Sequence, residues 1–276
     1  MDDDHRAGTG NWSAFARNMN DVHTAAEDWK RAVAGIEKPW LCWNINDEWC
    51  AFQQKIILSV GWTPVIGWDP SCNPGKRTVF NKSVEIDFNK SFSFDSLWPH
   101  FPLEFAFLWT KKLAFWHADL LLRINKLRKL VELFESIEDG DMAAVESKGG
   151  LRNILSFRTH RYWELLGCTT QKASKHQFDT GCGWWRHFYL HPNTPIEERH
   201  TRAKYYYDSG VGIMYWKRRY KKNIYSIKEK WASEGHCTQI NNPHYQSGKN
   251  KGEELNVNFS IEKVAERLDL LGFLGP

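Results

Sequence analysis

The stretch PWLCWNINDEWCAFQQKIILSVGWTPVIGW, residues 39–68, has the pattern of a strand, a helix and a second strand. Trp40–Asn46 is a short apolar run of strand length, and Thr63–Trp68 is a second run of the same kind. Between the two runs, Asp47 suits a helix N-cap and Glu48–Val60 has the composition of a helix. A strand, a helix and a second strand in this order predict a βαβ unit, in which the two strands lie parallel.

Candidate strands and helices continue to alternate after this unit. Val84–Phe88 alternates apolar and acidic residues as a strand does, and a helix is expected over Leu103–Lys112. Leu113–Leu122 reads as a buried central strand, and Ile124–Ser136 is a helix with its apolar residues on one face. A further strand is expected over Met142–Glu146. This order predicts an α/β fold with a mainly parallel central sheet and helices on both faces.

The same patterns divide the chain into three parts. Residues 1–37 are an N-terminal leader that turns helical from about Asp21, and residues 38–195 form the α/β domain. Residues 196–276 are expected to form a helical, basic C-terminal extension that packs on the same core. Inside the α/β domain, we expect a helix over residues 159–166.

The composition is that of a folded protein without secretory or membrane-spanning segments. Of the 276 residues, 42% are hydrophobic and 25% are charged, which is close to the globular average. The six cysteines include no CxxC pair, and the polar N-terminus lacks the basic and apolar regions of a signal peptide. No apolar run approaches the ~20 residues that cross a bilayer. We therefore expect a cytoplasmic protein with reduced thiols.

His117 and Asp119 interrupt the otherwise apolar run Leu113–Leu122. Residues two apart on a strand point to the same face, so both side chains are able to reach one ligand near the end of that strand. Imidazole and carboxylate ligands suit Mn²⁺ or Zn²⁺, and open α/β sheets bind ligands at the carboxyl ends of their strands. The pair therefore predicts part of a metal site, with a buried and self-satisfied His–Asp pair as the alternative.

The order of the βαβ unit, a helix and the strand KLAFWHAD, residues 112–119, resembles the nucleotide-sugar domain of GT-A glycosyltransferases. The resemblance covers about residues 38–195. In that family an Asp-x-Asp motif closes a central strand and holds the metal that bridges the donor's diphosphate. Here His117 replaces the first Asp and Asp119 matches the second. The resemblance implies a GT-A/Rossmann-like fold, a Mn²⁺ or Mg²⁺ cofactor, and transfer of a sugar from a nucleoside-diphosphate sugar to the hydroxyl of a carbohydrate or other acceptor.

The family also places contacts to the donor's base and ribose at the ends of the first strands. These ends correspond, by position alone, to Asn46, Asp47 and Asp69. A helix cap explains Asp47 equally well, and a turn explains Asp69. All three are therefore candidates for donor binding.

A glycine-rich segment with adjacent tryptophans, residues 178–192, is the second candidate site. Its glycines allow close approach of a ligand, and the indoles of Trp184 and Trp185 offer faces for a sugar. Arg186 or His187 would neutralise a phosphate. The resemblance implies that such an acceptor segment follows the metal strand. A turn beside a tryptophan-filled core is the alternative.

Two carboxylates are candidates for the general base that activates an acceptor hydroxyl. Asp179 lies at the start of the glycine-rich segment, and Glu164 lies in the preceding predicted helix, whose exposed face explains it equally well. The resemblance also implies a later histidine ligand in some members of the family. His187 or His191 would then complete the metal site.

The C-terminal extension suggests a different class of function. Trp216–Lys222 and Lys228–Lys230 combine basic and aromatic residues, in a chain whose net charge is +4. Such a patch suits a non-catalytic protein that binds nucleic acid or a polyanionic partner, or an anionic membrane surface, although a solvated helix face explains it as well. No RNA- or DNA-binding signature accompanies the patch, so nucleic acid is disfavoured. A third option is a metal-dependent hydrolase that uses the same His and Asp.

Three absent motifs disfavour other enzyme classes. No GxGxxG follows a strand, and neither GxxxxGK[ST] nor GxSxG occurs. Dinucleotide-dependent enzymes, P-loop NTPases and typical α/β-hydrolases are therefore disfavoured.

Overall fold

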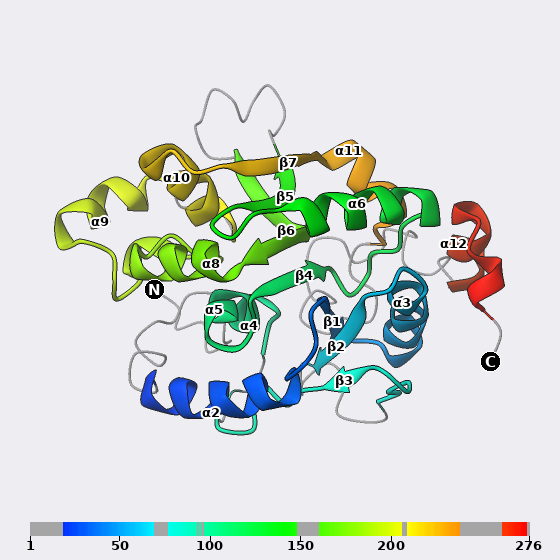
Figure 1. Ribbon diagram of the computed structural model, residues 1–276. Coiled ribbons are helices and arrows are strands. Elements are labelled where there is room, and N and C mark those ends of the chain that lie inside the picture. The colour runs from blue at the N-terminus through cyan, green and yellow to red at the C-terminus, as the bar shows by residue number, and fades with distance from the viewer. Residues whose placement is uncertain are drawn as a thin grey trace.

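The central element of the computed structural model is one sheet of seven strands, in the order β3-β2-β1-β4-β6-β5-β7 (Figure 1). The structure describes residues 19–68, 77–92, 94, 97–147, 160–205, 209–237 and 261–274. The strands are β1 (Pro39–Asn44), β2 (Thr63–Trp68), β3 (Val84–Glu85), β4 (Lys112–Trp116), β5 (Met142–Ser147), β6 (Arg161–Thr170) and β7 (Ile224–Lys228).

The sheet is mostly parallel, as predicted, and one inner strand runs against the others. β1 pairs in parallel with both β2 and β4, β2 with β3, and β5 with β7. β6 is antiparallel to β4 and to β5. The α/β fold class is therefore confirmed.

The helix predicted over residues 159–166 is wrong, because this stretch starts β6. Its apolar residues Tyr162, Leu165 and Leu166 have helical spacing, which misled the prediction. The apolar residues of β6 are spaced irregularly because the pairing register between β5 and β6 shifts between Ala144 and Val145. An irregularity of this kind breaks the strict alternation that identifies a strand.

Helices cover both faces of the sheet. They are α2 (Met19–Ala32), α3 (Asp47–Ser59), α4 (His100–Glu104), α5 (Ala106–Trp109), α6 (Ile124–Ser136), α8 (Gln171–Asp179), α9 (Ile196–Ala203), α10 (Val211–Tyr220), α11 (Glu229–Ala232) and α12 (Ile261–Leu268). Short 3₁₀ turns are η1 (Phe188–Leu190), η2 (Ser233–Gly235) and η4 (Leu271–Phe273). The helices predicted near residues 21–34, 48–60 and 124–136 are confirmed.

Two apolar cores lie on the two faces, because successive strand residues point to opposite sides. On β1, Leu41 and Trp43 belong to the core that includes residues of α2, α5, α8 and α10. Trp40 and Cys42 belong to the core that includes residues of α3, α6 and α12. This alternation places helices on both faces, as the sequence predicted.

Several predicted boundaries are corrected. The helix expected over Leu103–Lys112 is instead the short pair α4 and α5, and β4 already begins at Lys112. The strand expected to continue to Leu122 ends at Trp116. The C-terminal part is not only helical, because its strand β7 forms an edge of the central sheet. The loop predicted over residues 241–258 lies outside the described residues.

The cysteine side chains are buried within this fold. Five described cysteines are free thiols, and burial raises the pKa of both Cys50 and Cys168 to about 12. Those two thiols therefore stay protonated at neutral pH. Within the described ranges, no helix combines the length and the apolar character needed to cross a bilayer.

Gly167 tests the packing of the central sheet. A Cβ atom at this position would lie 2.4 Å from the Ala143 carbonyl oxygen and 2.5 Å from the Phe115 ring. We expect Gly167→Ala to lower the free energy of unfolding by about 1–3 kcal/mol, because backbone of β5 has to move. Urea unfolding monitored by tryptophan fluorescence measures this value. Gly272→Ala is the control, because nothing lies within 4 Å of its Cβ position; equal effects of the two substitutions would contradict the packing.

Candidate metal centre

The turn that follows β4 carries the two predicted metal ligands. The backbone N–H of His117 donates to the carbonyl of Leu165 in β6 at 2.9 Å. The buried Gln53 of α3 donates its amide to the carbonyls of both His117 and Leu120, at 2.8 Å each. The turn that carries His117 and Asp119, at the carboxyl end of β4, is therefore hydrogen-bonded both to β6 and to α3.

A distant segment pairs with this turn and brings a second histidine beside His117 and Asp119. Cys237 donates its N–H to the carbonyl of Asp119 at 2.8 Å, and Leu121 donates to the carbonyl of Gly235 at 3.2 Å. Leu120 and His236 form an antiparallel bridge between these bonds. A Cβ atom on Gly235 would lie 2.1 Å from the Leu121 carbonyl oxygen, so this close pairing requires glycine.

His117, Asp119 and His236 form the group whose ligand atoms lie within 4.8 Å of one another, the one such group of three or more in the described chain. His236 Nε2 is 3.1 Å from Asp119 Oδ1, and His117 Nδ1 is 3.7 Å from the same oxygen. The two imidazoles approach to 3.4 Å through His117 Nδ1 and His236 Nε2. Two imidazoles and one carboxylate suit Mn²⁺, Zn²⁺ or another first-row divalent ion. The His117 side chain is 23% exposed, so the cluster is not sealed in the interior.

Glu164 lies behind His117 and is placed to orient it. Its Oε1 is 3.6 Å from His117 Nε2, on the side of the ring away from Asp119. The same oxygen is 2.9 Å from His100 Nε2 and accepts from the Ser209 hydroxyl at 2.9 Å. Burial alone would raise the pKa of Glu164, but the charge of His100 and the close approach of His117 outweigh it and hold that pKa well below the ordinary value. A carboxylate behind a histidine ligand fixes the ring orientation and the tautomer.

Trp163 forms an aromatic wall beside the cluster. Its ring meets those of His117 and His236 edge-on, with centroids 5.7 and 5.4 Å away. The Arg161 guanidinium lies over the Trp163 ring, 5.2 Å from its centroid, and donates to the Ser209 carbonyl. The half-buried Trp163 therefore contacts both histidines of the cluster, and the half-buried Arg161 lies over the same indole.

The end of β1 carries two of the predicted donor-binding residues, and both have structural partners. Asn46 caps α3, because its side chain accepts from the Trp49 N–H at 3.1 Å. Asp47 is the first residue of α3 and accepts from the N–H and the hydroxyl of Thr78, at 2.6 and 2.7 Å. The expectation that Asp47 is the cap is therefore corrected, and Asp69 lies outside the described residues.

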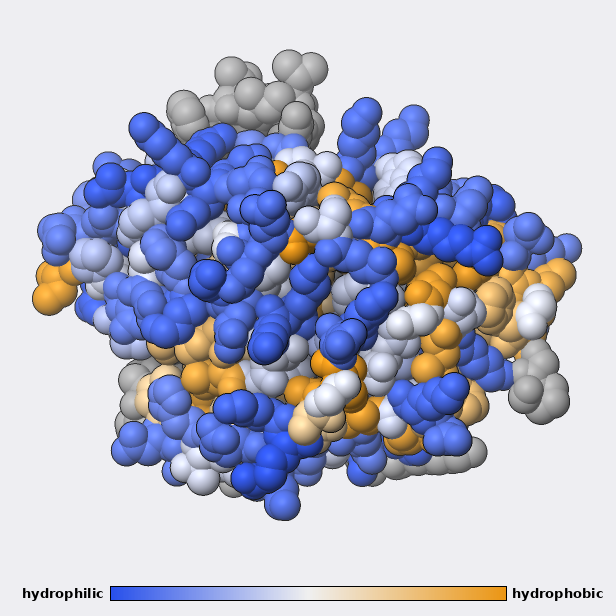
Figure 2. Space-filling model, in the orientation of Figure 1, coloured by the Kyte–Doolittle hydropathy of each residue, from blue (hydrophilic) through white to orange (hydrophobic). Residues whose placement is uncertain are grey.

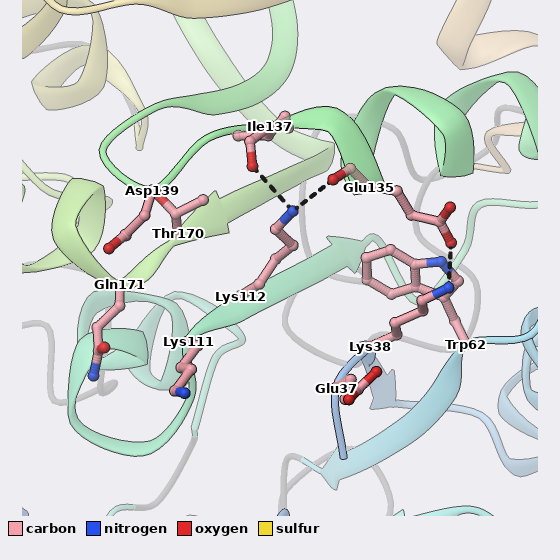
Figure 3. Close-up of a pocket in the computed structure, with 10 residues that line it drawn as sticks. All are labelled: Glu37, Lys38, Trp62, Lys111, Lys112, Glu135, Ile137, Asp139, Thr170 and Gln171. Atoms are coloured by element: carbon pink, nitrogen blue, oxygen red, sulfur yellow. Dashed lines mark hydrogen bonds and ion pairs between the residues drawn. The ribbon is translucent and has the colours of Figure 1, made fainter. Parts of the chain in front are cut away.

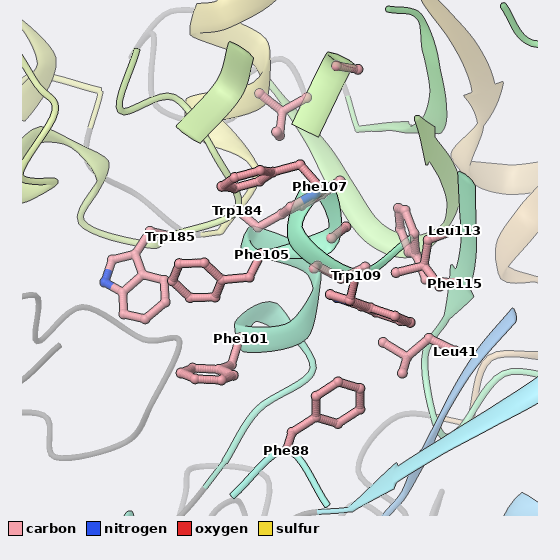
Figure 4. Close-up of a cluster of buried hydrophobic side chains, with 14 of the residues drawn as sticks. Leu41, Phe88, Phe101, Phe105, Phe107, Trp109, Leu113, Phe115, Trp184 and Trp185 are labelled. Atoms are coloured by element: carbon pink, nitrogen blue, oxygen red, sulfur yellow. The ribbon is translucent and has the colours of Figure 1, made fainter. Parts of the chain in front are cut away.

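The predicted tryptophan platform is wrong. Trp184 and Trp185 are 0% and 1% exposed and lie among the core aromatics of α4 and α5 (Figure 4). The Trp184 ring meets Phe115 edge-on at 5.2 Å, and the backbone N–H of Trp184 donates to Glu104 Oε2 at 2.7 Å. Their faces are therefore not available to an acceptor, and the alternative of a tryptophan-filled core applies.

The other residues of the glycine-rich segment lie apart from the metal cluster. His191 is fully buried, with its Nε2 3.4 Å from Glu104 and its ring against Phe178. It does not belong to the group of possible ligands, whose third member is His236. Half-buried Arg186 and His187 lie in the turn before η1, where the His187 ring packs edge-on against Tyr189. The Asp179 carboxylate is held by Lys175, at 2.6 Å, on the exposed surface of α8.

The basic residues of α10 are largely used to hold neighbouring elements. Lys217 donates to the Tyr162 hydroxyl, and Arg218 lies 2.8 Å from His160 Nδ1. Arg219 lies 3.4 Å from Glu198. These three cations therefore have partners within the fold, and binding of a polyanion by residues 216–222 and 228–230 stays a prediction.

His236 was missed by sequence analysis, which treated the neighbouring residues as a basic helical extension. The one local signal is a histidine directly after a glycine in the stretch EGHC, residues 234–237. That signal is weak, because His236 reaches the cluster only through the bridge to Leu120, a residue more than a hundred positions earlier in the chain. Comparison with protein-family models, with curated proteins and with solved structures gives no match for this chain.

Removal of a ligand is expected to abolish tight metal binding. We expect Asp119→Asn and His236→Ala each to weaken Mn²⁺ binding by more than about 100-fold, because loss of an outer partner alone costs 10–100-fold. Isothermal titration calorimetry with Mn²⁺ measures the change. His200→Ala, on the exposed surface of α9, is the control and should bind as the parent does. Unchanged affinity in either ligand variant would exclude this cluster as the site.

Replacement of Glu164 tests its role in orienting His117. We expect Glu164→Gln to weaken Mn²⁺ binding by about 10–100-fold and to change the visible spectrum of bound Co²⁺, because His117 loses its carboxylate partner. Glu146→Gln is a matched control, since Glu146 pairs with His160 at 2.9 Å outside the cluster. Circular dichroism verifies folding of both variants. Identical Co²⁺ spectra of the parent and Glu164→Gln would show that Glu164 does not position the ligand.

Proposed function

We propose that this protein is a metal-assisted glycosyltransferase of the GT-A-like type, which moves a sugar from a nucleoside-diphosphate sugar to an acceptor hydroxyl. One observation carries the proposal: His117, Asp119 and His236 converge at the carboxyl end of β4, the position that the resemblance assigns to the metal-binding motif. His236 supplies a third ligand, which supports the metal role although His117 replaces the first acidic residue.

The strand order supports a nucleotide site at the same place. From β1 the chain proceeds outward to β2 and β3, and then returns to β4 on the other side of β1. The carboxyl ends of β1 and β4 therefore flank a point where the strand order reverses, and ligands of open α/β sheets bind at such a point. Asn46 and Asp47 follow β1, and the metal cluster follows β4.

In the proposed reaction, these residues would mainly position the metal ion and neutralise the charge of the diphosphate. A divalent ion at this site would offset the negative charge that develops on the leaving diphosphate. Asp119, His117 and His236 would bind it, and Glu164 would hold the His117 ring in its binding tautomer. Arg161, beside the cluster, would add a fixed positive charge toward the phosphates.

The residues proposed to lie near the acceptor differ from those expected from the sequence. Trp163 is the aromatic residue next to the metal ligands, in place of the buried Trp184 and Trp185. Glu164 faces His100, His117 and Ser209, which fits a positioning residue better than the general base. Asp179 is left out of the site, because Lys175 holds its carboxylate.

Donor binding is the direct test of this function. In a thermal-shift assay with a panel of nucleoside-diphosphate sugars, we expect at least one donor to raise the melting temperature, because a ligand that binds only the folded state stabilises it. The rise should require Mn²⁺ or Mg²⁺ and should disappear in Asp119→Asn. Flat melting temperatures across the panel would count against the proposal. Turnover of a simple phosphoester without acceptor would favour a metal-dependent hydrolase.

A further inference from the structure

A second feature of the surface lies beside the segment that carries His236. A cavity of about 500 Å³ is bordered by the start of α6 and by α11 and η2. Four cations line it, against a single carboxylate: Arg123, Lys126, Lys129, Lys230 and Glu234. Such an excess of one charge favours an anionic ligand, because the walls concentrate the field inside a hollow.

The one carboxylate is already saturated by two of these cations. Glu234 accepts from Arg123 at 2.9 Å through Oε1, and its Oε2 is 2.6 Å from Lys126. These hydrogen bonds, that of Lys126 first, hold the pKa of Glu234 below its ordinary value. Lys126 also donates to the Trp231 carbonyl at 2.8 Å, and Arg123 donates to the Arg267 carbonyl. Arg123 and Lys126 are therefore already bound to Glu234 and to backbone carbonyls of the protein.

The remaining polar groups of the cavity are mostly donors. Lys129 and Lys230 are exposed, and across the described ranges neither has an acidic partner. The exposed Asn125 also lines the cavity and adds an amide donor. Two ammonium groups suit a phosphate, which accepts several hydrogen bonds and carries up to two negative charges.

A second cavity of similar size lacks the excess of positive charge that favours an anionic ligand. The cavity at the opposite, amino-terminal end of β1 and β4 has a volume of about 610 Å³ (Figure 3). Its charges are balanced, three of each sign: Lys38, Lys111, Lys112, Glu37, Glu135 and Asp139. Lys112 is bound to three carbonyls at the end of α6, and Lys38 is bound to Glu135. The face of the molecule seen in Figure 2 is hydrophilic over most of its area.

We infer that the cavity beside α6 and α11 binds a phosphate group through Lys129 and Lys230. The ligand class is a phosphate ester or a phospholipid headgroup, and both present the same chemistry to the two ammonium groups. The site stands apart from the proposed transferase chemistry. It adjoins the candidate metal centre in the chain, because Glu234 precedes His236 by two residues.

Phosphate binding by the whole chain, in EDTA and without donor, tests this inference. Inorganic phosphate is titrated and followed by ³¹P NMR line width, and the Lys129→Gln/Lys230→Gln variant should bind at least about tenfold more weakly. Lys129→Arg/Lys230→Arg should restore binding, because the charge is kept. Lys30→Gln/Lys90→Gln removes the same charge from exposed positions outside the cavity and should bind as the parent does.

A vesicle arm separates the two sources of phosphate. Co-sedimentation is measured with phosphatidylcholine vesicles that contain or lack phosphatidylglycerol. Retention on the anionic vesicles that requires Lys129 and Lys230 identifies a headgroup, and lysine-dependent binding of free phosphate alone identifies a soluble ester. Binding by neither probe, or an equal loss in the Lys30→Gln/Lys90→Gln control, would overturn the inference. EDTA and the absence of donor keep this result independent of the proposed transferase activity.

Discussion

The short antiparallel pairing between the turn after β4 and residues 235–237 is the interaction on which the candidate site depends. Two backbone hydrogen bonds flank the bridge between Leu120 and His236 and fix the spacing of Asp119 from the distant histidine. Because Gly235 has no side chain, its backbone approaches that of Leu121 closely enough for these bonds to form. Without this pairing, the turn after β4 would carry only His117 and Asp119, and the candidate site would lack His236.

The rest of the fold holds that pairing in place. Gln53 ties the turn to α3, and Glu164 ties the His117 ring to β6 and to His100. Two aromatic-rich cores on the two faces of the sheet immobilise β4 and β6. Arg123 and Lys126 bind Glu234, two residues before His236, and so connect the start of α6 to the same segment. The site is therefore carried by rigid elements, as precise placement of ligands requires.

Local sequence patterns predicted most of the sheet and half of the site. The βαβ unit at residues 39–68 and the helix Ile124–Ser136 follow from periodicity, because one buried face dictates each pattern. His117 and Asp119 were found because polar residues interrupt an apolar run. β6 was misread as a helix, since a shift in its pairing with β5 depends on the partner strand. His236 and the role of Glu164 were hidden because contacts between distant residues leave almost no local signal.

The tryptophans show why composition misleads about exposure. Trp184 and Trp185 lie between glycines and charged residues, yet both are buried, Trp184 against Phe115 and Trp185 next to Phe105 (Figure 4). Trp163, in a stretch read as a helix, is the indole that meets the metal cluster. An aromatic residue in a polar stretch therefore reveals its role only after the strand register is known.

A divalent ion held by three side chains from two distant segments would be visible by anomalous diffraction at the manganese edge, from crystals of the full chain soaked in Mn²⁺. We expect a peak bounded by Nδ1 of His117, Oδ1 of Asp119 and Nε2 of His236. A strong peak elsewhere, with none among these three atoms, would contradict this expectation.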